Sequence, residues 1–471
     1  MNKIKFINRE EELRYVRESA ELSKKKLFCL SISGLRRIGK TRLILEIIKN
    51  SDLYFFVNKN KNSLSLLKEY EENLKVKKIL GELEYLSNWD QFFGVIFKRF
   101  NGILVFDEFQ NFFHVDKTIF GILQKYIDLN ENKKNLLIIF CGSLVGLNKK
   151  LFQDSKEPLY GRVKRKLNMK ELSFKNIIKM CNELKIKNME EVIEIYTIFG
   201  GFPKYYVSIE DENLIGSNVW KILERFFFSE NAILEEEVGD ILSLEFGKRS
   251  GIYYDILTAI ANGNTKISKI ASCLRKKESS LTRQIRDLVN YFELVGIEKQ
   301  IYGKKSLFYI RHPLMNFWFR FIYKNLSSYK RRENWLIDKI KNDFNSYVGS
   351  GFERVCRGFI EENKLFQFTK IGKQWGTIPG KKQGENQYEI DIVALNEQKR
   401  EILFGECKWK DRVNPEKVLQ ELKEKAGYVD WNKGKRKEYY AIFAKSFSKK
   451  INENRVLLFD LKDMEKVFRK R

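Results

Sequence analysis

Residues able to bind a phosphate stand together near the start of the chain. The loop consists of Gly34, Leu35, Arg36, Arg37, Ile38, Gly39, Lys40 and Thr41. It matches the whole G-x-x-x-x-G-K-T pattern, in which glycines let successive backbone amides curl around a phosphate. The ammonium of Lys40 would neutralise the β- and γ-phosphates of ATP, and the hydroxyl of Thr41 would reach Mg²⁺. The loop therefore predicts a site for ATP and Mg²⁺, with an accidental strand-to-helix turn as the alternative.

Two acidic residues follow a second apolar segment. Residues 103–106 are Ile-Leu-Val-Phe, and Asp107 and Glu108 come directly after them. Carboxylates at the C-terminal end of a parallel strand face the crevice where ligands bind. We therefore predict that Asp107 holds the Mg²⁺ shell and that Glu108 polarises the attacking water. Without a phosphate loop upstream, the same pattern would indicate a solvated strand end.

Two further side chains are candidates for catalysis. Ser143 follows the apolar run 136–141, where it could sense the γ-phosphate, and an ordinary strand-ending turn is an equal alternative. Arg162 follows the turn-forming stretch 158–161 and could reach the phosphates in cis or from a neighbouring subunit. A homo-oligomer therefore stays open. The alternative for Arg162 is a surface arginine in the basic patch 164–166.

A second acidic constellation lies towards the other end of the chain. Alternating apolar residues on both sides of the turn 396–399 indicate a β-hairpin. Pairing of Leu395 with Ile402 would set Asp391 opposite Glu406, because side chains alternate between the faces of a strand. Two carboxylates that face each other across a strand pair could hold Mg²⁺.

A lysine completes this C-terminal pattern. Lys408 stands two residues beyond Glu406, where a cation could approach an attacked phosphate. Asp391 with Glu406-x-Lys408 resembles the core motif of the PD-(D/E)xK nucleases, and the resemblance implies Glu353 as an upstream acid. Two alternatives stay open: a nuclease-like fold without cleavage, and a sheet edge protected by salt-bridged charges.

The segment 251–330 has the pattern of a DNA-binding module. Helical spacing and then two short apolar runs occur at 252–260, 267–274, 279–289, 294–297 and 307–310. This order indicates a winged helix-turn-helix, in which Arg283 and Arg286 would face a DNA groove. Lys304 and Lys305, in the turn between the strands, would contact phosphates. The segment holds 14 basic and 5 acidic residues, a balance of +9 that favours DNA over a packing or partner-docking role.

Composition sets the outer limits of this interpretation. With 471 residues the chain is long enough for two to four domains, and 43% hydrophobic residues can fill their cores. The formal net charge of +26 favours a polyanionic partner, and nucleic acid is the natural candidate. A lysine-rich genome or a thermophilic surface is the alternative source of this charge.

Neither a membrane nor a histidine-based metal site is indicated. No apolar run approaches the ~20 residues of a spanning helix, and no secretion signal is recognisable, so we expect a cytoplasmic protein. The six cysteines form no C-x-x-C pair, which argues against a disulfide framework and a zinc knuckle. Because His114 and His312 are the only histidines, carboxylates must hold any metal ion.

Five motifs in order point to one family. They lie at Phe6–Leu13, Gly34–Thr41, Asp107–Gln110, Pro158–Arg162 and Gly200–Tyr206. Together they resemble the archaeal P-loop ATPase family, which is related to the AAA+ and STAND NTPases. The resemblance implies ATPase activity, a position near the adenine for residues 8–10, and a helical lid that opens at residues 200–206. Leu35 departs from the proline that relatives often carry, which should stiffen the loop less.

The candidate sites require an α/β framework to position them. We expect 1–172 to form an α/β P-loop domain with a mainly parallel sheet, and 173–248 to form the helical lid. The winged helix-turn-helix would occupy 249–312, and 313–471 would form a helical connector with a restriction-endonuclease-like α/β domain. These parts predict an ATPase that acts on or with DNA and carries a metal-dependent nuclease domain. The alternative is a nucleotide-controlled DNA-binding or signalling switch without cleavage.

Overall fold

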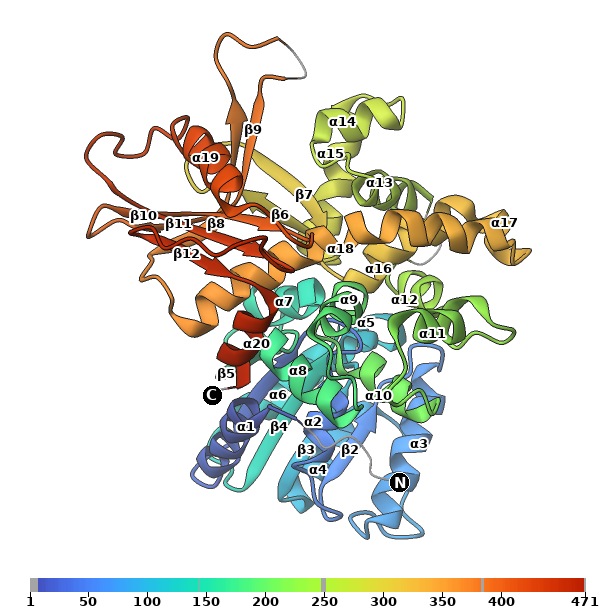
Figure 1. Cartoon of the computed structure of the whole chain (residues 1–471). Helices are drawn as coiled ribbons and strands as arrows, with labels where there is room; N and C mark the ends of the chain where they lie inside the picture. Colours follow the sequence, from blue (N-terminus) through green and yellow to red (C-terminus); the bar gives the residue numbers. More distant parts are fainter. Residues whose placement is uncertain (1–6, 144, 247–250, 383–384, 470–471) are drawn as a thin grey trace.

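The computed structural model describes residues 7–143, 145–246, 251–382 and 385–469. Phe6 of the opening motif and the predicted domain boundary between 248 and 249 lie outside the described residues. Figure 1 shows an α/β layer formed by the first third of the chain, with a second sheet formed by the last quarter on the other side of a helical region.

A five-stranded parallel sheet forms the centre of the N-terminal part. Its strands are β1 (Phe28–Ser33), β2 (Leu53–Phe56), β3 (Gly102–Asp107), β4 (Leu136–Gly142) and β5 (Arg165–Asn168), in the order β2-β3-β4-β1-β5. All neighbouring pairs run parallel. A strand covered on both faces needs unbroken apolar sequence, and every residue of β4 is buried. The predicted parallel sheet is confirmed.

Helices cover both faces of this sheet. They are α1 (Glu10–Ser23), α2 (Lys40–Leu45), α3 (Ser63–Val76), α4 (Trp89–Arg99), α5 (Phe112–Val115), α6 (Thr118–Leu129) and α7 (Val145–Gln153), with the 3₁₀ turn η1 (Phe109–Asn111). Leu43 and Val105 belong to a mainly aliphatic cluster, whereas Phe92 and Phe106 belong to a second cluster that is rich in aromatic rings. Helix α2 ends at Leu45, so the apolar residues 47–48 pack from the turn that follows it.

A mainly helical region follows the first sheet. It begins with α8 (Phe174–Glu183), α9 (Met189–Phe199), α10 (Pro203–Asp211), α11 (Val219–Leu223), the π-helix η2 (Glu224–Phe228) and α12 (Glu237–Phe246). It continues with α13 (Gly251–Ala261), α14 (Ile267–Cys273), α15 (Glu278–Arg286), the π-helix η3 (Asp287–Tyr291) and the antiparallel strands β6 (Val295–Lys299) and β7 (Ser306–Ile310). Three helices and a two-stranded hairpin thus occur in the predicted order.

A long helix connects this region to the second sheet. Short elements precede it: α16 (Pro313–Phe317), the π-helix η4 (Trp318–Ile322), the 3₁₀ turn η5 (Tyr323–Asn325) and α17 (Leu326–Lys330). The connecting helix is α18 (Asn334–Asn363), which has 30 residues. Among the residues that the structure describes, no helix is both long enough and apolar enough to cross a membrane.

The second sheet is mixed and lies near the C-terminus. Its elements are β8 (Lys370–Thr377), β9 (Gln387–Asn396), β10 (Glu401–Lys408), α19 (Pro415–Ala426), β11 (Lys437–Ala444), β12 (Val456–Phe459) and α20 (Leu461–Arg469), with the strand order β12-β11-β10-β9-β8. Strand β9 runs antiparallel to both neighbours, while β10, β11 and β12 are parallel. Leu395 pairs with Ile402, as predicted. A mixed α/β domain at this end of the chain is therefore confirmed.

One apolar core joins the helical region to the second sheet. It runs from Leu172 through the lid and α18 to Phe468. Helix α9 approaches α18 so closely that a Cβ built on Gly351 would lie 2.0 Å from Oγ1 of Thr197. The lid, the helices after 251 and the helical connector are therefore packed as one body.

Candidate functional site

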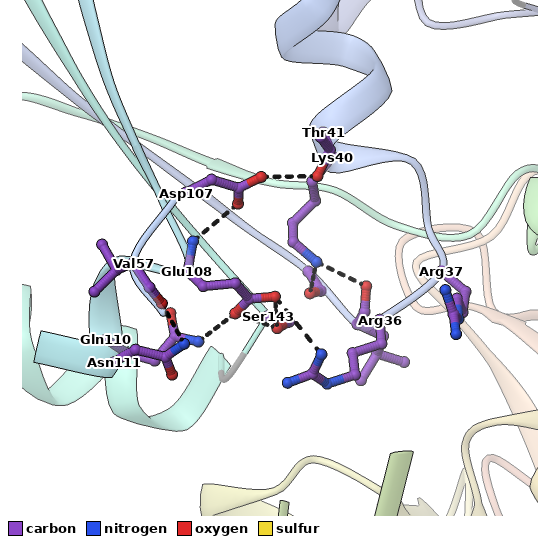
Figure 2. A network of polar contacts seen from close by, with 12 residues as sticks. Arg36, Arg37, Lys40, Thr41, Val57, Asp107, Glu108, Gln110, Asn111 and Ser143 are labelled. Carbon is purple, nitrogen blue, oxygen red and sulfur yellow. Dashed lines mark hydrogen bonds and ion pairs between the residues drawn. The ribbon is translucent and has the colours of Figure 1, made fainter. Parts of the chain in front are cut away.

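The predicted phosphate loop connects β1 to α2. Gly39 has a φ of 96° and Arg37 a φ of 66°, and this left-handed backbone turns the loop back on itself. A Cβ on Gly34 would lie 2.7 Å from the carbonyl oxygen of Met169, so the loop starts against the end of β5. Lys40 is 7% exposed, and its Nζ donates to the carbonyl oxygens of Gly34 and Leu35, at 2.9 and 3.0 Å (Figure 2).

Asp107 connects the loop to the strand beside it. Its side chain is 3% exposed, and its Oδ2 accepts hydrogen bonds from the hydroxyls of Thr41, at 2.8 Å, and Tyr54, at 2.7 Å. Burial and the Asp107 charge raise the pKa of Tyr54, so Tyr54 stays a donor. Carboxylate and hydroxyl oxygens are ligands that Mg²⁺ prefers, so Thr41 and Asp107 fit the predicted role.

Glu108 lies at the centre of a polar network. Its φ of 53° is left-handed, a strained conformation that is frequent at functional sites. Ser143 donates its hydroxyl to both carboxylate oxygens at 2.7 Å, and Gln110 donates to one of them (Figure 2). A guanidinium nitrogen of Arg36 lies 3.7 Å from the same carboxylate. The structure therefore brings Ser143 and Arg36 of the predicted set to Glu108, and adds Gln110, which the sequence analysis quoted only within a motif.

Two arginines tie the loop to more distant elements. Arg9 is buried and donates to the carbonyl oxygens of Ile38, at 3.2 Å, and Lys170, at 2.9 Å. Arg37 binds both carboxylate oxygens of Glu237 in α12, at 2.7 and 2.8 Å. The sequence pattern gave no signal for Glu237, which lies 200 residues away. The phosphate loop is thus attached directly to the lid.

Tyr205 connects Glu237, the partner of Arg37, to His312 at the start of α16. The hydroxyl of Tyr205 donates to Glu237 at 3.4 Å and lies 3.4 Å from Nε2 of His312. Burial and the Arg37 charge lower the pKa of His312 to about 3, so this imidazole is neutral near pH 7. The ring stacks on Phe202 with centroids 4.0 Å apart. His312 therefore has a packing role between the lid and α16.

Arg162 lies away from the phosphate loop. Its guanidinium pairs with Asp128 at 3.0 and 3.1 Å, and it lines a cavity with Lys26 and Leu27, which precede β1. The loop follows the other end of β1, and six strand residues at about 3.3 Å each put roughly 20 Å between the two edges. The prediction that Arg162 reaches the phosphates in cis is therefore wrong. Contact from a neighbouring subunit stays a prediction.

A β-bulge places Asp391 in the second sheet. Val393 pairs with Gly372 and Ile390 with Gln374, so Asp391 and its neighbour face a single residue of β8. The bulge breaks the predicted side-chain alternation along β9. Asp391 now shares a cavity with Glu353 of α18, and its Oδ2 accepts a hydrogen bond from the backbone amide of Cys407 at 2.8 Å. Its pKa is raised to about 7 by burial and by the charges of Glu353 and Glu406.

Glu406 is held by two lysines. Lys408 donates to Oε1 at 2.8 Å, and Lys425 of α19 donates to Oε1 and Oε2 at 2.8 and 3.0 Å. Lys373 of β8 similarly pairs with Glu353. In the described parts of the chain, no group of three or more His, Cys, Asp or Glu side chains is arranged to hold a metal ion. The roles of Asp391 and Glu406 as metal ligands stay predictions, and Lys373 and Lys425 are partners that the sequence analysis missed.

The predicted DNA contacts lie on exposed surface. They are Arg283 and Arg286 of α15, and Lys304 and Lys305 between β6 and β7. The hairpin itself is anchored on the second sheet, since the amide of Ile301 donates to the carbonyl oxygen of Lys373 at 3.0 Å. The amide of Tyr302 donates to Oε1 of Gln374 at 3.1 Å. The turn that carries Lys304 and Lys305 is therefore held against β8 of the second sheet.

The parallel sheet, the phosphate loop and the acids after β3 define a P-loop ATPase. The model of an ATPase domain found predominantly in Archaea matches residues 6–209, and a model of archaeal and bacterial proteins of unknown function matches residues 318–424. An uncharacterised protein of Methanocaldococcus jannaschii is 32% identical over 477 residues, covering 97% of this chain and 99% of the relative. The chain belongs to this archaeal ATPase family, as the resemblance implied.

Solved structures of two archaeal proteins are similar to this chain. A Walker-type ATPase of Pyrococcus abyssi is 21% identical, with a TM-score of 0.52 over 68% of this chain and 98% of that one. The ORC2 protein of Aeropyrum pernix, in ADPNP and ADP complexes, is 13% identical, with a TM-score of 0.47 over 72% of this chain and 97% of that one. The first similarity shows a common fold for the ATPase part.

Proposed function

We propose that the chain hydrolyses ATP with Mg²⁺ at the Gly34–Thr41 loop and uses the nucleotide state to control contacts with DNA. The observation that carries the proposal is the hydrogen bond between Thr41 and Asp107, with Glu108 one residue further on. The loop and the end of β3 together bring one hydroxyl and two carboxylates to one edge of a parallel sheet, where ligands of such sheets bind. Membership of the archaeal ATPase family supports ATP as the nucleotide bound at this loop.

Each residue has a distinct task in this reaction. Lys40, now held by two loop carbonyls, would turn to the phosphates of ATP. Mg²⁺, held by Thr41 and Asp107, would withdraw charge from the β- and γ-phosphates. Glu108 would accept a proton from the attacking water. The oxygen of that water would form a bond to the γ-phosphorus while the bond from the γ-phosphorus to the β–γ bridging oxygen breaks. Ser143 fixes the carboxylate through both oxygens, so it positions Glu108.

The DNA part of the proposal rests on charge and exposure. The segment 251–330 carries a balance of +9, and its predicted contacts, Arg283, Arg286, Lys304 and Lys305, lie on exposed surface. Arg37 of the loop pairs with Glu237, and Glu237 is hydrogen-bonded to Tyr205. The hydroxyl of Tyr205 lies 3.4 Å from Nε2 of His312, which belongs to the segment 251–330. A nucleotide that moves Arg37 would therefore change how the lid holds the DNA-facing helices.

A second candidate activity is cleavage of DNA at the second sheet. Asp391, at a β-bulge beside Glu353, is the observation that favours it, because carboxylates beside a basic cavity suit a metal-dependent nuclease. The two lysines bound to Glu406 favour the alternative, a nucleotide-controlled DNA-binding switch. Cleavage would require Lys425 to release Glu406 so that the carboxylate is open to a metal ion.

One assay series tests these proposals together. ATP hydrolysis and plasmid nicking are measured with and without Mg²⁺ and DNA for the wild type, Lys40→Ala, Asp391→Asn and Glu406→Ala. We expect Lys40→Ala to abolish hydrolysis and Asp391→Asn to spare it. Nicking that needs Mg²⁺ and disappears in Asp391→Asn supports cleavage. If the wild type binds DNA but does not nick it, the result supports the nucleotide-controlled DNA-binding switch and argues against cleavage.

A further inference from the structure

A cavity rich in cations lies where the lid, the predicted winged helix-turn-helix and the second sheet meet. Its volume is about 300 Å³, and α9, α13, β7, α16, α18 and β9 contribute to its walls. Figure 1 shows α13, α16, α18 and β7 converging in this part of the molecule. Four cationic side chains line the cavity: Arg320, Arg354, Arg357 and Lys373.

Two of these cations are neutralised by neighbouring acids. Arg357 pairs with Glu298 at 2.9 Å, and Lys373 pairs with Glu353. Arg320 and Arg354 form no ion pair with a carboxylate among the residues that the structure describes. Two guanidinium charges in one partly enclosed space repel each other, so the arrangement favours an anion between them.

Both unpaired guanidiniums lie over aromatic rings. Arg354 lies 4.8 Å from the ring centroid of Tyr196 and donates one hydrogen bond to the Tyr196 carbonyl oxygen at 3.3 Å. Its buried Nε has no hydrogen-bond partner within the described chain. Arg320 lies 5.5 Å from the ring centroid of Tyr347. A guanidinium over an aromatic ring can still donate hydrogen bonds to an oxyanion, and a buried donor without a partner is costly unless a ligand uses it.

We propose that this cavity is a phosphate-binding site, in which Arg320 and Arg354 hold a phosphodiester group of a DNA strand. The proposal deepens the DNA contact proposed above and rests on it. A phosphodiester offers two charged oxygens, and each arginine can donate to them through two nitrogens. The same cavity contains Asp391, so a strand held by the two arginines would pass the predicted cleavage site. It also contains Thr197 of the lid helix α9, so an occupied site would contact the ATPase lid directly.

Binding to a labelled single strand tests the site. The probe is a fluorescent oligonucleotide of about 15 nucleotides, comparable to known single-strand site sizes. Full-length protein is titrated in EDTA, which prevents metal-dependent cleavage, and every protein carries Lys40→Ala so that the phosphate loop captures no phosphate. We expect Arg320→Gln and Arg354→Gln each to weaken binding by about 10-fold or more, because each removes a charge-assisted contact. Arg17→Gln, on the exposed surface of α1, is the matched control and should bind like its parent.

Further arms separate the possible sources of the phosphate and the possible failures. Inorganic pyrophosphate should displace the labelled strand from the parent protein but not from Arg354→Gln. This result would support a cavity that binds the phosphate groups of both ligands. Arg354→Lys keeps the charge and should recover part of the affinity, while a thermal unfolding curve identifies a misfolded variant. Unchanged binding in Arg320→Gln and Arg354→Gln overturns the cavity site, even if reversal of the four exposed DNA-facing cations abolishes binding. Absence of strand binding in the parent overturns the DNA contact itself, whereas pyrophosphate bound through Arg354 would then show a site for smaller phosphates.

Discussion

The two acidic sites of the chain differ in the partners of their carboxylates. In the N-terminal site, Asp107 accepts hydrogen bonds from two hydroxyl groups. Glu108 accepts hydrogen bonds from a hydroxyl and an amide group, and a guanidinium nitrogen of Arg36 lies 3.7 Å from it. In the C-terminal site, Glu406 accepts hydrogen bonds from two lysine ammonium groups. Neutral donors orient a carboxylate and leave its charge available, whereas an ammonium group neutralises it.

The charge of Asp107 is therefore available to a bound cation, whereas the charge of Glu406 is already neutralised by lysines. Asp107 can gain a Mg²⁺ contact without losing a counter-charge. Glu406 can do so only if Lys408 and Lys425 move away. The proposed ATP hydrolysis would therefore need no loss of a counter-charge at Asp107, whereas the proposed DNA cleavage would require a rearrangement around α19.

The largest expected effect comes from Glu108, the carboxylate that we propose as the proton acceptor. Glu108→Gln removes the carboxylate but keeps the size of the side chain and one acceptor oxygen for Ser143. We expect the rate of ATP hydrolysis to fall by about 10²–10⁴-fold with little change in ATP affinity. Steady-state hydrolysis and nucleotide titration measure the two quantities. Glu72→Gln, exposed on α3, is the control, and a Glu108→Gln enzyme as fast as this control would remove Glu108 from the reaction.

Stability should fall more at the C-terminal site than at the N-terminal site when one carboxylate is replaced by its amide. Glu406→Gln leaves two half-buried lysines without their carboxylate, so we expect the free energy of unfolding to fall by about 1–3 kcal/mol. Asp107→Asn removes no ion pair, and we expect a loss below about 1 kcal/mol. Denaturant unfolding compares the two variants. Equal losses would mean that lysine compensation does not distinguish the sites.

A pH effect should be specific to the C-terminal site. The pKa of Asp391 is raised from 3.8 to about 7 by burial and by Glu353 and Glu406. The folded chain therefore holds this proton more tightly than the unfolded chain, so the contribution of Asp391 to stability falls as pH rises through this interval. We expect Asp391→Asn to reduce the fall in unfolding free energy between about pH 4 and 7, on the order of 1–3 kcal/mol. If the unfolding free energy of wild type and variant depends on pH in the same way, the raised pKa of Asp391 is contradicted.

The smallest effect is expected at the link between the loop and the lid. Arg37→Ala removes the ion pair with Glu237, which is partly exposed and adds little to stability. ATP binding should persist, while the change in DNA affinity on adding ATP should shrink by about 5-fold. Arg42→Ala breaks a largely exposed pair with Glu46, the residue after α2, and serves as the control. Equal coupling in both variants would show that nucleotide state reaches the C-terminal half by another route.

Local sequence patterns predicted the parallel sheet and the position of the phosphate loop between a strand and a helix. The phosphate loop, Asp107 and Glu108 lie at the ends of apolar strands, and such strands are recognisable within a few residues. The pairing of Leu395 with Ile402 followed from a short turn, which fixes the register of a hairpin.

Contacts between distant segments were beyond the reach of these patterns. Arg162 was placed near the phosphates by its position after a turn, but packing puts it at the other edge of the sheet beside Asp128. The bulge at Asp391 depends on how β8 pairs with β9, and Lys425 approaches Glu406 from a separate helix. Spacing along the chain carries no signal for such neighbours.

Steady-state ATP hydrolysis by the full chain, with and without DNA, tests the central claim most directly. With Mg²⁺ present, we expect turnover above the Lys40→Ala background and a different rate when DNA is added. Hydrolysis that never exceeds the Lys40→Ala background under any condition would contradict a catalytic role for Asp107 and Glu108, and would reduce the loop to a nucleotide-binding switch.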